Sequence, residues 1–414
     1  MGKILVHICC GVDSVYALRV IKDQMPDKEL VGYFYDPNIH PQQEYELRWI
    51  ETKRVCDSLG IECIKGEYEL DIWLQRVKGY ESEPERGERC SICHDLRLEK
   101  SAQLAKELGA NYLTTVLMMS PKKEFEVLKS IGERVANKYG LEFLTFDFRK
   151  KCGVEKMNLL SRQFQLYHQN YCGCVYGLFS QRMEVKFYPE LTSFSKGRLA
   201  GSREELLFIK QIRLFAENLG IECFEKQFSF IKWSLTSSIL KIDGKEIFHK
   251  VLPYSVSVKG VLRDRVEKFV ETPEKKIYRL HKSNLEIWKI NKIDDFLYDE
   301  MRFNTDPVFL VEEDINLGAK IEIQLKSDFD PSGKSQNLVI GNLKALEMEV
   351  FYSDTDYYGA GGYELQDITS FLYKNQTAIR KSKLCVVIFG AHFCGKIGER
   401  IFHQSLSNTE ILSM

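Results

Sequence analysis

Six of the twelve cysteines in this 414-residue chain occur as three close pairs, Cys9 with Cys10, Cys90 with Cys93, and Cys172 with Cys174. Thiols so close in sequence are typical ligands of zinc or of an iron-sulfur cluster. A secreted disulfide framework would need an export signal, and neither an apolar leader nor a run of membrane-spanning length is visible. We therefore expect a cytoplasmic protein without membrane contact whose thiols bind metal.

Six thiols are more than one ordinary metal site uses. A tetrahedral zinc ion takes four ligands, and a four-iron cluster likewise takes four thiolates. Asp13 follows the first pair within one helical turn and adds a carboxylate, although an Asp there also commonly caps a helix. The surplus ligands favour a second metal beside the first, or a redox-active dithiol next to a cluster; a structural zinc site remains the alternative.

Alternating apolar runs and helical periods predict the elements that position these ligands. Such alternation is typical of an α/β fold in which helices cover both faces of a parallel sheet. Groups that follow the strands gather at the carboxyl edge of such a sheet, where we expect Cys9, Cys10, Asn38 and Ser120. The predicted strands are 3–8, 30–35, 61–64, 112–116 and 143–146, and the predicted helices are 14–21, 44–59, 100–108 and 122–139.

A change of composition at residues 193–202, which are rich in Ser, Lys and Gly, predicts a domain boundary. We expect one domain at 1–190 and a second α/β domain at 191–414 with a β-rich insertion at about 245–320. With 58 basic and 59 acidic residues, the chain lacks the basic excess typical of nonspecific nucleic-acid binding. The short basic runs Lys122–Lys123 and Arg149–Lys151 could form a local patch, though such runs are more often solvated surface.

The segment Cys9-Cys10-Gly11-Val12-Asp13-Ser14 follows a predicted strand and opens a predicted helix. It resembles the PP-loop of ATP pyrophosphatases, S-G-G-x-D-S, with Gly11, Asp13 and Ser14 retained. Two cysteines replace the first Ser-Gly, which crowds a pyrophosphate and supplies soft ligands instead. A thiol at a helix N-terminus also has a lowered pKa, which favours metal binding.

Several separated segments carry a further pattern: the turn at Cys9 and Cys10, Tyr35 to Pro41 with Glu44, Tyr45 and Arg48, Pro84 to Cys93, Thr114 and Thr115 with Ser120 to Lys123, and Tyr171 to Cys174. Together these segments resemble the epoxyqueuosine reductases of the QueH family, over about residues 3–176. Many members read Cys-Cys-Ala-Pro-Cys-Ser at the first turn, so Asp13 stands here in place of a cysteine. This departure favours a mixed thiolate and carboxylate ligand set.

The resemblance implies an oxidoreductase that removes the epoxide oxygen of epoxyqueuosine at the wobble position of tRNA to give queuosine, without cobalamin. It implies a 4Fe-4S cluster, and we expect an adjacent iron or other divalent metal and an unidentified electron donor. Asp13, Cys9 and Cys10 are the predicted catalytic residues. Tyr35, Asn38, Ser120 and Lys123 are the predicted substrate-binding residues, and His40 and Lys122 are further proton-donor candidates. The predicted metal ligands are Cys9, Cys10, Asp13, Cys90, Cys93, Cys172 and Cys174.

From about residue 201 the order of segments resembles dinuclear zinc aminopeptidases. Their ligands are mostly replaced, because Tyr352-Ser353-Asp354 stands for His-x-Asp, Gly362 for the bridging Asp, and His392-Phe393 for the Glu pair. We therefore expect a degenerate, noncatalytic domain that forms a homo-oligomer surface or contacts tRNA. Two alternatives to the reductase stay open: a PP-loop-like iron-sulfur tRNA thiolase, and a zinc-stabilised tRNA-binding module.

Overall fold

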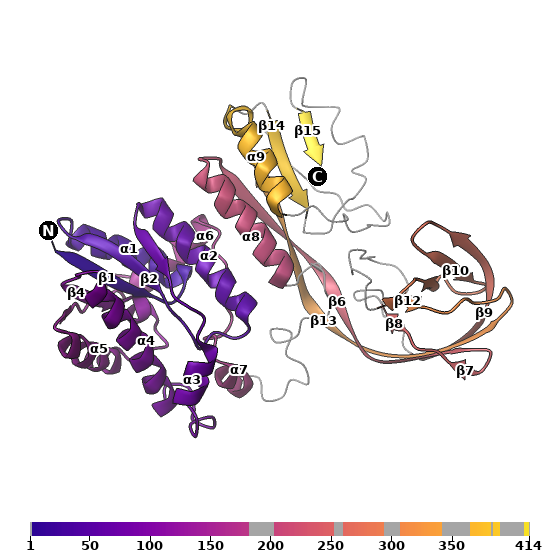
Figure 1. Cartoon of the computed structure of the whole chain (residues 1–414), viewed down its shortest axis with the longest axis horizontal. Coiled ribbons are helices and arrows are strands. Elements are labelled where there is room, and N and C mark those ends of the chain that lie inside the picture. Colours follow the sequence, from indigo (N-terminus) through magenta and orange to yellow (C-terminus); the bar gives the residue numbers. More distant parts are fainter. Residues whose placement is uncertain are drawn as a thin grey trace. The chain divides into compact units, whose positions relative to one another are not determined.

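The computed structural model describes residues 2–181, 203–251, 260–293, 307–341, 365–381, 384–389 and 410–413. The chain divides into two compact units, Met1–Ser193 and Phe194–Met414, and each is described by itself (Figure 1). Across the described ranges, none of the helices combines the length and the apolar character needed to cross a membrane.

The first unit is built on a five-stranded sheet in which all neighbouring strands are parallel, in the order β3-β2-β1-β4-β5. The predicted α/β class is confirmed. The strands of this sheet are β1 (Lys3–Ile8), β2 (Glu29–Phe34), β3 (Glu62–Lys65), β4 (Tyr112–Thr115) and β5 (Glu142–Phe143). Its helices are α1 (Gly11–Gln24), α2 (Gln42–Leu59), α3 (Leu70–Arg76), α4 (Glu88–Glu107), the 3-10 helix η1 (Val116–Met119), α5 (Phe125–Tyr139), α6 (Gly153–Gln163) and α7 (Val175–Gln181).

Helices cover both faces of this sheet (Figure 1). Successive side chains of a strand point to opposite faces, so Ile4, Val6 and Ile8 join the core formed with α1 and α2. Leu5 joins the opposite core, which contains buried residues of α4 and α5. A central strand that is apolar on both faces explains the continuous apolar run at the start of the sequence.

Several predicted boundaries differ from the structure, and three of them concern α4, α5 and β5. Helix α4 begins at Glu88 rather than at residue 100, so its first turns carry Cys90 and Cys93. The spacing of apolar residues does not indicate these first turns, because a charged residue, Arg89, takes the buried position there. Its guanidinium donates to the carbonyl groups of Tyr80, Glu81 and Glu83. Helix α5 begins at residue 125 rather than 122, and β5 ends at residue 143 rather than 146.

The strand order reverses beside β1. The chain passes from β1 to β2 on one side, and after β3 it crosses to β4 on the other side. Such a switch point leaves a crevice outside the carboxyl ends of the two strands, and this is where α/β proteins bind ligands. Cys9 follows β1 directly, and Ser120 ends the short η1 helix after β4.

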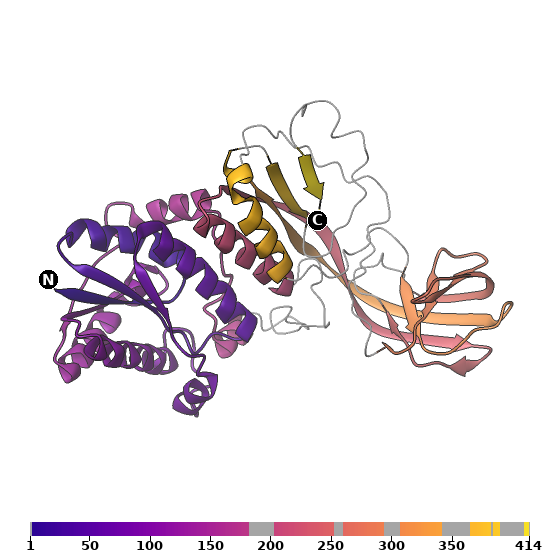
Figure 2. The same ribbon diagram turned by 45° about the horizontal axis from the view of Figure 1, so that its top comes forward.

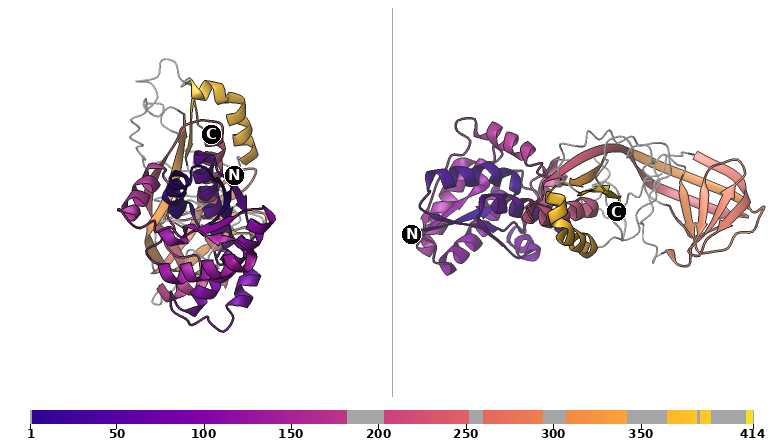
Figure 3. Two further views of the ribbon diagram at one scale, coloured as in Figure 1. Left: turned by 90° about the vertical axis from the view of Figure 1, so that its left-hand side faces the viewer. Right: turned by 90° about the horizontal axis from the view of Figure 1, so that it is seen from above.

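The second unit is organised by two long antiparallel strands, β6 (Cys223–Ile242) and β13 (Lys320–Ile340), whose pairing runs from Cys223 with Ile340 to Ile242 with Ile321. Figure 3 shows these two strands running along each other. Helices α8 (Arg203–Asn218) and α9 (Leu365–Arg380) lie side by side and share a core with the end of β13 (Figure 2). The remaining strands are β7 (Lys245–Glu246), β8 (Lys250–Val251), β9 (Gly260–Glu271), β10 (Lys276–Leu280), β11 (Glu286–Lys289), β12 (Val308–Val311), β14 (Leu384–Phe389) and β15 (Glu410–Ser413).

The β-rich character of this unit is confirmed, and β10, β11 and β12 lie within the range 245–320 of the predicted insertion. Residues 252–259 of this range lie outside the described part, with β8 ending at Val251 and β9 starting at Gly260. The strands β6 and β13 were not predicted. Most positions of the aminopeptidase-like pattern, including Tyr352 to Asp354, Gly362, His392 and Phe393, also lie outside the described residues.

Candidate metal centre

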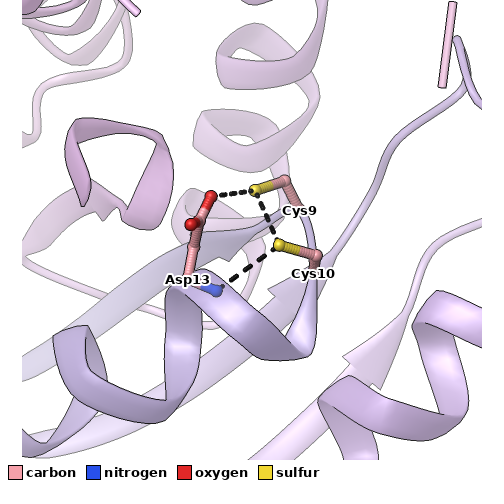
Figure 4. A group of neighbouring side chains, drawn as sticks. All are labelled: Cys9, Cys10 and Asp13. Carbon is pink, nitrogen blue, oxygen red and sulfur yellow. Dashed lines mark hydrogen bonds between the residues drawn. The ribbon is translucent and has the colours of Figure 1, made fainter. Parts of the chain in front are cut away.

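The turn between β1 and α1 places two thiols and a carboxylate together (Figure 4). Cys10 is the N-cap of α1, and its Sγ accepts a hydrogen bond from the backbone N–H of Asp13 at 3.5 Å. Cys9 Sγ lies 3.8 Å from Cys10 Sγ and donates to Asp13 Oδ2 at 3.5 Å. One ligand atom from each of the three residues lies within 4.8 Å of the others, which suits a single metal ion.

Gly11 lets this turn approach α2 closely. A Cβ atom there would lie 2.8 Å from the backbone carbonyl carbon and oxygen of Glu51, closer than real Cβ contacts. The Cys10 sulfur thus occupies the helix N-terminus where a PP-loop protein would receive a phosphate. The local structure favours a soft cation over a nucleotide at this turn.

The second pair lies on the first turns of α4 and meets the third pair. Cys93 and Cys174 are buried in one small core with Trp73 and Leu96. Cys90 Sγ accepts from the backbone N–H of Arg86 at 3.3 Å, and Cys174 Sγ accepts from that of Gly177 at 3.5 Å. Backbone donors of this kind stabilise thiolates.

Arg48 holds the third pair in place. Its Nη1 donates to the Cys172 carbonyl at 2.9 Å and its Nη2 to the Tyr171 carbonyl at 3.1 Å. Its Nε bonds the buried Glu44 carboxylate at 2.8 Å. Between the two cysteines, Gly173 adopts φ 108°, and its carbonyl accepts from the His40 N–H at 2.9 Å. The loop is therefore fixed from α2 and from the segment after β2.

Five of the six paired cysteines line one cavity of about 250 Å³, here called the sulfur cavity. Cys93 is not among the lining residues and shares a small buried core with Cys174. The five cysteines come from the β1–α1 turn, from α4 and from the loop before α7. The predicted ligands among its lining residues are Cys9, Cys10, Asp13, Cys90, Cys172 and Cys174.

Cations next to Cys172 change its acidity. Lys123 Nζ donates to Cys172 Sγ at 3.3 Å. Burial alone raises the pKa of this thiol, but Lys123, Arg97 and Arg48 outweigh burial and hold the pKa below its ordinary value. The pKa of Lys123 is raised by the same thiolate, so the side chain stays cationic.

The neighbouring thiols behave differently. Burial raises the pKa of Cys93 to about 12 and that of Cys174 to about 11. The pKa of Cys9 is raised by its hydrogen bond with Cys10 and by burial, and burial also raises that of Asp13. A bound metal cation reverses this preference, because it stabilises the ionised ligands.

The predicted substrate-binding residues divide into two groups. Ser120 and Lys123 line the sulfur cavity, as does the proton-donor candidate Lys122. Tyr35 and Asn38 are not among the lining residues. Tyr35 donates to Glu69 at 2.6 Å, while Asn38 is 1% exposed and its side-chain amide has no hydrogen-bond partner in the described part. His40 likewise meets the Tyr171–Cys174 loop through its backbone rather than lining the cavity.

Three further residues that line the cavity, Asp36, His94 and Arg97, were not predicted as site residues. Asp36, two residues after the end of β2, forms a buried ion pair with Arg97 of α4. Burial raises the pKa of Asp36 to about 6 against the opposing effect of Arg97. His94 lies one turn after Cys90 on α4, and burial together with Lys123 and Arg97 lowers its pKa. The signal for His94 and Arg97 was their spacing from Cys90, once α4 is known to start at Glu88.

The first unit is a parallel α/β domain with a thiol-lined cavity at its switch point, and the cavity's thiols and carboxylate are suitable metal ligands. A family model described as epoxyqueuosine reductase QueH matches residues 4–180. Epoxyqueuosine reductase QueH from Helicobacter pylori is 45% identical over 183 residues, covering 43% of this chain and 50% of that protein. The QueH protein from Thermotoga maritima is 34% identical over 185 residues, covering 44% of this chain and 93% of that protein. This chain belongs to the QueH family, and it spans about half the length of the Helicobacter pylori relative.

Two solved structures overlap the chain more weakly. The U34-tRNA thiolase NcsA from Methanococcus maripaludis, with its [4Fe-4S] cluster, has a TM-score of 0.30 and 16% identity, covering 44% of this chain and 63% of that one. An aminopeptidase from Aneurinibacillus has a TM-score of 0.21 and 12% identity, and the overlap covers 36% of this chain and 45% of that one. Overlaps of this size carry no functional argument, and the aminopeptidase resemblance of residues 191–414 stays a prediction.

Proposed function

We propose that this protein reduces the epoxide of epoxyqueuosine in tRNA to the alkene of queuosine, as a cobalamin-independent oxidoreductase. The observation that carries the proposal is the convergence of five paired cysteines, Asp13 and Lys123 on one cavity at the β1/β4 switch point, with Cys93 in a buried core that it shares with Cys174. The proposed reaction is the one for which the QueH family is named. The sulfur cavity is where we place the electron carrier, the acid group and the base extruded from the tRNA.

The ligand set fits two metal groups rather than one. Cys9, Cys10 and Asp13 are close enough to share one ion, and we assign them an iron or other divalent metal. We assign Cys90, Cys93, Cys172 and Cys174 to a 4Fe-4S cluster. Four thiolates on one zinc ion would lie about 3.8 Å apart; in the described chain, no group of three or more of these four closes to within 4.8 Å. These longer sulfur–sulfur distances disfavour a single zinc ion and suit a larger group such as a four-iron cluster.

Removal of the epoxide oxygen as water consumes two electrons and two protons and leaves a carbon–carbon double bond. When bound, the cluster would supply electrons from an unidentified donor, and the adjacent metal would supply Lewis acidity. Lys123 lines the cavity, and its ammonium, which donates to Cys172 Sγ, would stabilise negative charge that develops on the departing oxygen. Lys122 lines the same cavity and is exposed, so it can exchange protons with solvent.

A basic rim supports tRNA as the substrate. Arg86 Nε donates to the Lys122 carbonyl at 3.2 Å, and Arg149 Nη1 donates to the Lys123 carbonyl at 3.2 Å. Two basic segments distant in sequence therefore meet at the 120–123 loop, which borders the sulfur cavity. Phosphates that flank the target nucleotide would find cations here, while the base enters the cavity.

No observation favours the thiolase or the zinc module over the reductase. Thiolation would require nucleotide binding at the β1–α1 turn, where the Cys10 sulfur caps the helix and Gly11 lies against α2. Self-association or a tRNA contact through residues 191–414 stays a separate proposal.

The decisive experiment incubates the full chain, purified without oxygen, with tRNA that carries epoxyqueuosine and with dithionite. We expect queuosine in the digested nucleosides by mass spectrometry, with iron and acid-labile sulfide bound to the protein. Unchanged epoxyqueuosine with an intact cluster would rule out the reductase. Added ATP and a sulfur source test thiolation in parallel.

A further inference from the structure

Two further cysteines of the first unit, Cys56 and Cys63, come together outside the sulfur cavity. Cys56 is buried near the end of α2, and Cys63 is half-buried on β3, which is an edge strand of the five-stranded sheet. Neither residue lines the sulfur cavity. The pair is therefore separate from the ligands assigned to metal above, and the proposed reaction does not use it.

Gly32 of β2 leaves the space in which the two sulfurs lie. It is paired with Cys63 in the parallel register of β2 and β3. A Cβ atom on Gly32 would lie 3.2 Å from Cys63 Sγ and 3.5 Å from Cys56 Sγ, so both sulfurs border the same small space. The two thiols are also hydrogen-bonded to each other, and this bond together with burial raises the pKa of Cys56.

The backbone between the two cysteines fixes their approach. Helix α2 is closed by Gly60, whose φ of 63° turns the chain back toward the sheet. The N–H of Ile61 then donates to the carbonyl of Cys56 at 2.9 Å, directly before β3 begins. A short, hydrogen-bonded connection thus holds the two thiols together, and no distant part of the chain is needed for it.

We infer that Cys56 and Cys63 form a redox-active pair that a hydroperoxide converts reversibly into a disulfide. Hydrogen peroxide oxidises the half-buried Cys63 thiol to a sulfenic acid, which breaks the O–O bond and releases one water. The Cys56 sulfur then attacks the Cys63 sulfur, forms the S–S bond and releases the second water. The two thiols give up two electrons and two protons, which reduce the peroxide to water. An added dithiol restores both thiols by exchange.

The test treats the full-length protein, purified without oxygen and loaded with metal, with graded hydrogen peroxide. Catalase ends the reaction, and iodoacetamide in denaturant then labels every remaining thiol before digestion with trypsin. Trypsin cuts after Arg54 and Lys65, so both cysteines fall on one peptide, residues 55–65. Two labels on this peptide mean two thiols, whereas no label together with the loss of two hydrogen atoms means a disulfide. Cys152, which is exposed, falls on another tryptic peptide and reports the oxidation of an accessible thiol.

We expect the label-free peptide to accumulate with peroxide and dithiothreitol to restore both labels. Cys63→Ser should abolish the label-free form and leave Cys56 with its one label. Cys152→Ser is the matched control and should leave the reaction of the pair unchanged. Two labels on peptide 55–65 after Cys152 is fully oxidised would overturn the inference. A sulfinic acid on Cys63 with Cys56 unmodified, or a disulfide from either thiol to a different cysteine, would overturn it as well.

Discussion

The Nζ atom of Lys123 lies 3.3 Å from the Sγ atom of Cys172, although the two residues are 49 positions apart. This contact gives the two cysteines of one short loop different pKa values. Cys172 has a pKa below its ordinary value, whereas burial raises the pKa of Cys174 to about 11. A buried cation thus selects one thiol of the pair for ionisation.

The contact predicts a pH profile for thiol alkylation in metal-free protein. Because the pKa of Cys172 is lowered, its thiolate should predominate from a lower pH than for a free cysteine, and its reaction with iodoacetamide should rise at lower pH than that of Cys174. Lys123→Met should move the Cys172 profile to higher pH, while Lys122→Met, the exposed neighbour, should not. Mass spectrometry of the two peptides measures this, and an unmoved profile in Lys123→Met would show that the lysine does not control the thiol.

The assignment of ligands predicts two kinds of variant. Cys90→Ala or Cys172→Ala should lose the visible absorbance and acid-labile sulfide of the cluster, because a cluster thiolate is removed. Asp13→Ala should keep both and lose turnover, since it changes the other ligand group. Iron and sulfide analysis with the nucleoside assay checks both. Retained turnover in Asp13→Ala would end the case for a second metal at that turn.

Gly173 should resist substitution. Its φ of 108° is unfavourable for any residue with a Cβ atom, and an added Cβ would lie 2.8 Å from Ile39 Cγ1. Gly173→Ala should therefore displace the Cys172–Cys174 loop and reduce iron per chain by at least about half. Gly140→Ala is the matched control, because its φ is also positive, at 72°, but nothing lies within 4 Å of the added atom. Equal iron contents in the two variants would contradict this account.

Arg48 should affect stability and metal loading together. Removing one partner of a buried ion pair costs about 3 to 5 kcal/mol, so Arg48→Ala should lower the free energy of unfolding by that order. Arg48→Lys keeps the charge but not the planar donor fork that reaches both the Tyr171 and the Cys172 carbonyl groups. It should remain folded and bind less iron. Urea unfolding and iron analysis separate the two effects, and full iron in Arg48→Lys would show that the fork is not required.

Much of the first unit could be predicted from sequence, because its central strands β1 and β2 are buried on both faces and Cys9 directly follows β1. The convergence of the thiol pairs followed from the rule that ligands gather at the carboxyl edge of a parallel sheet. The start of α4 could not be predicted, since a buried Arg89 replaces the apolar period there. The contact of Arg48 with the Cys172 carbonyl spans 124 positions and depends on how α2 packs, which no local pattern contains.

The last strand of the five-stranded sheet ends at Phe143, but the sulfur cavity needs Cys172 and Cys174. During synthesis, the sheet can therefore assemble before the final ligands have left the ribosome. A chain synthesised only as far as Phe143 holds every strand of the sheet but not the complete set of candidate ligands. Loading of the whole centre with metal therefore requires the Cys172–Cys174 loop.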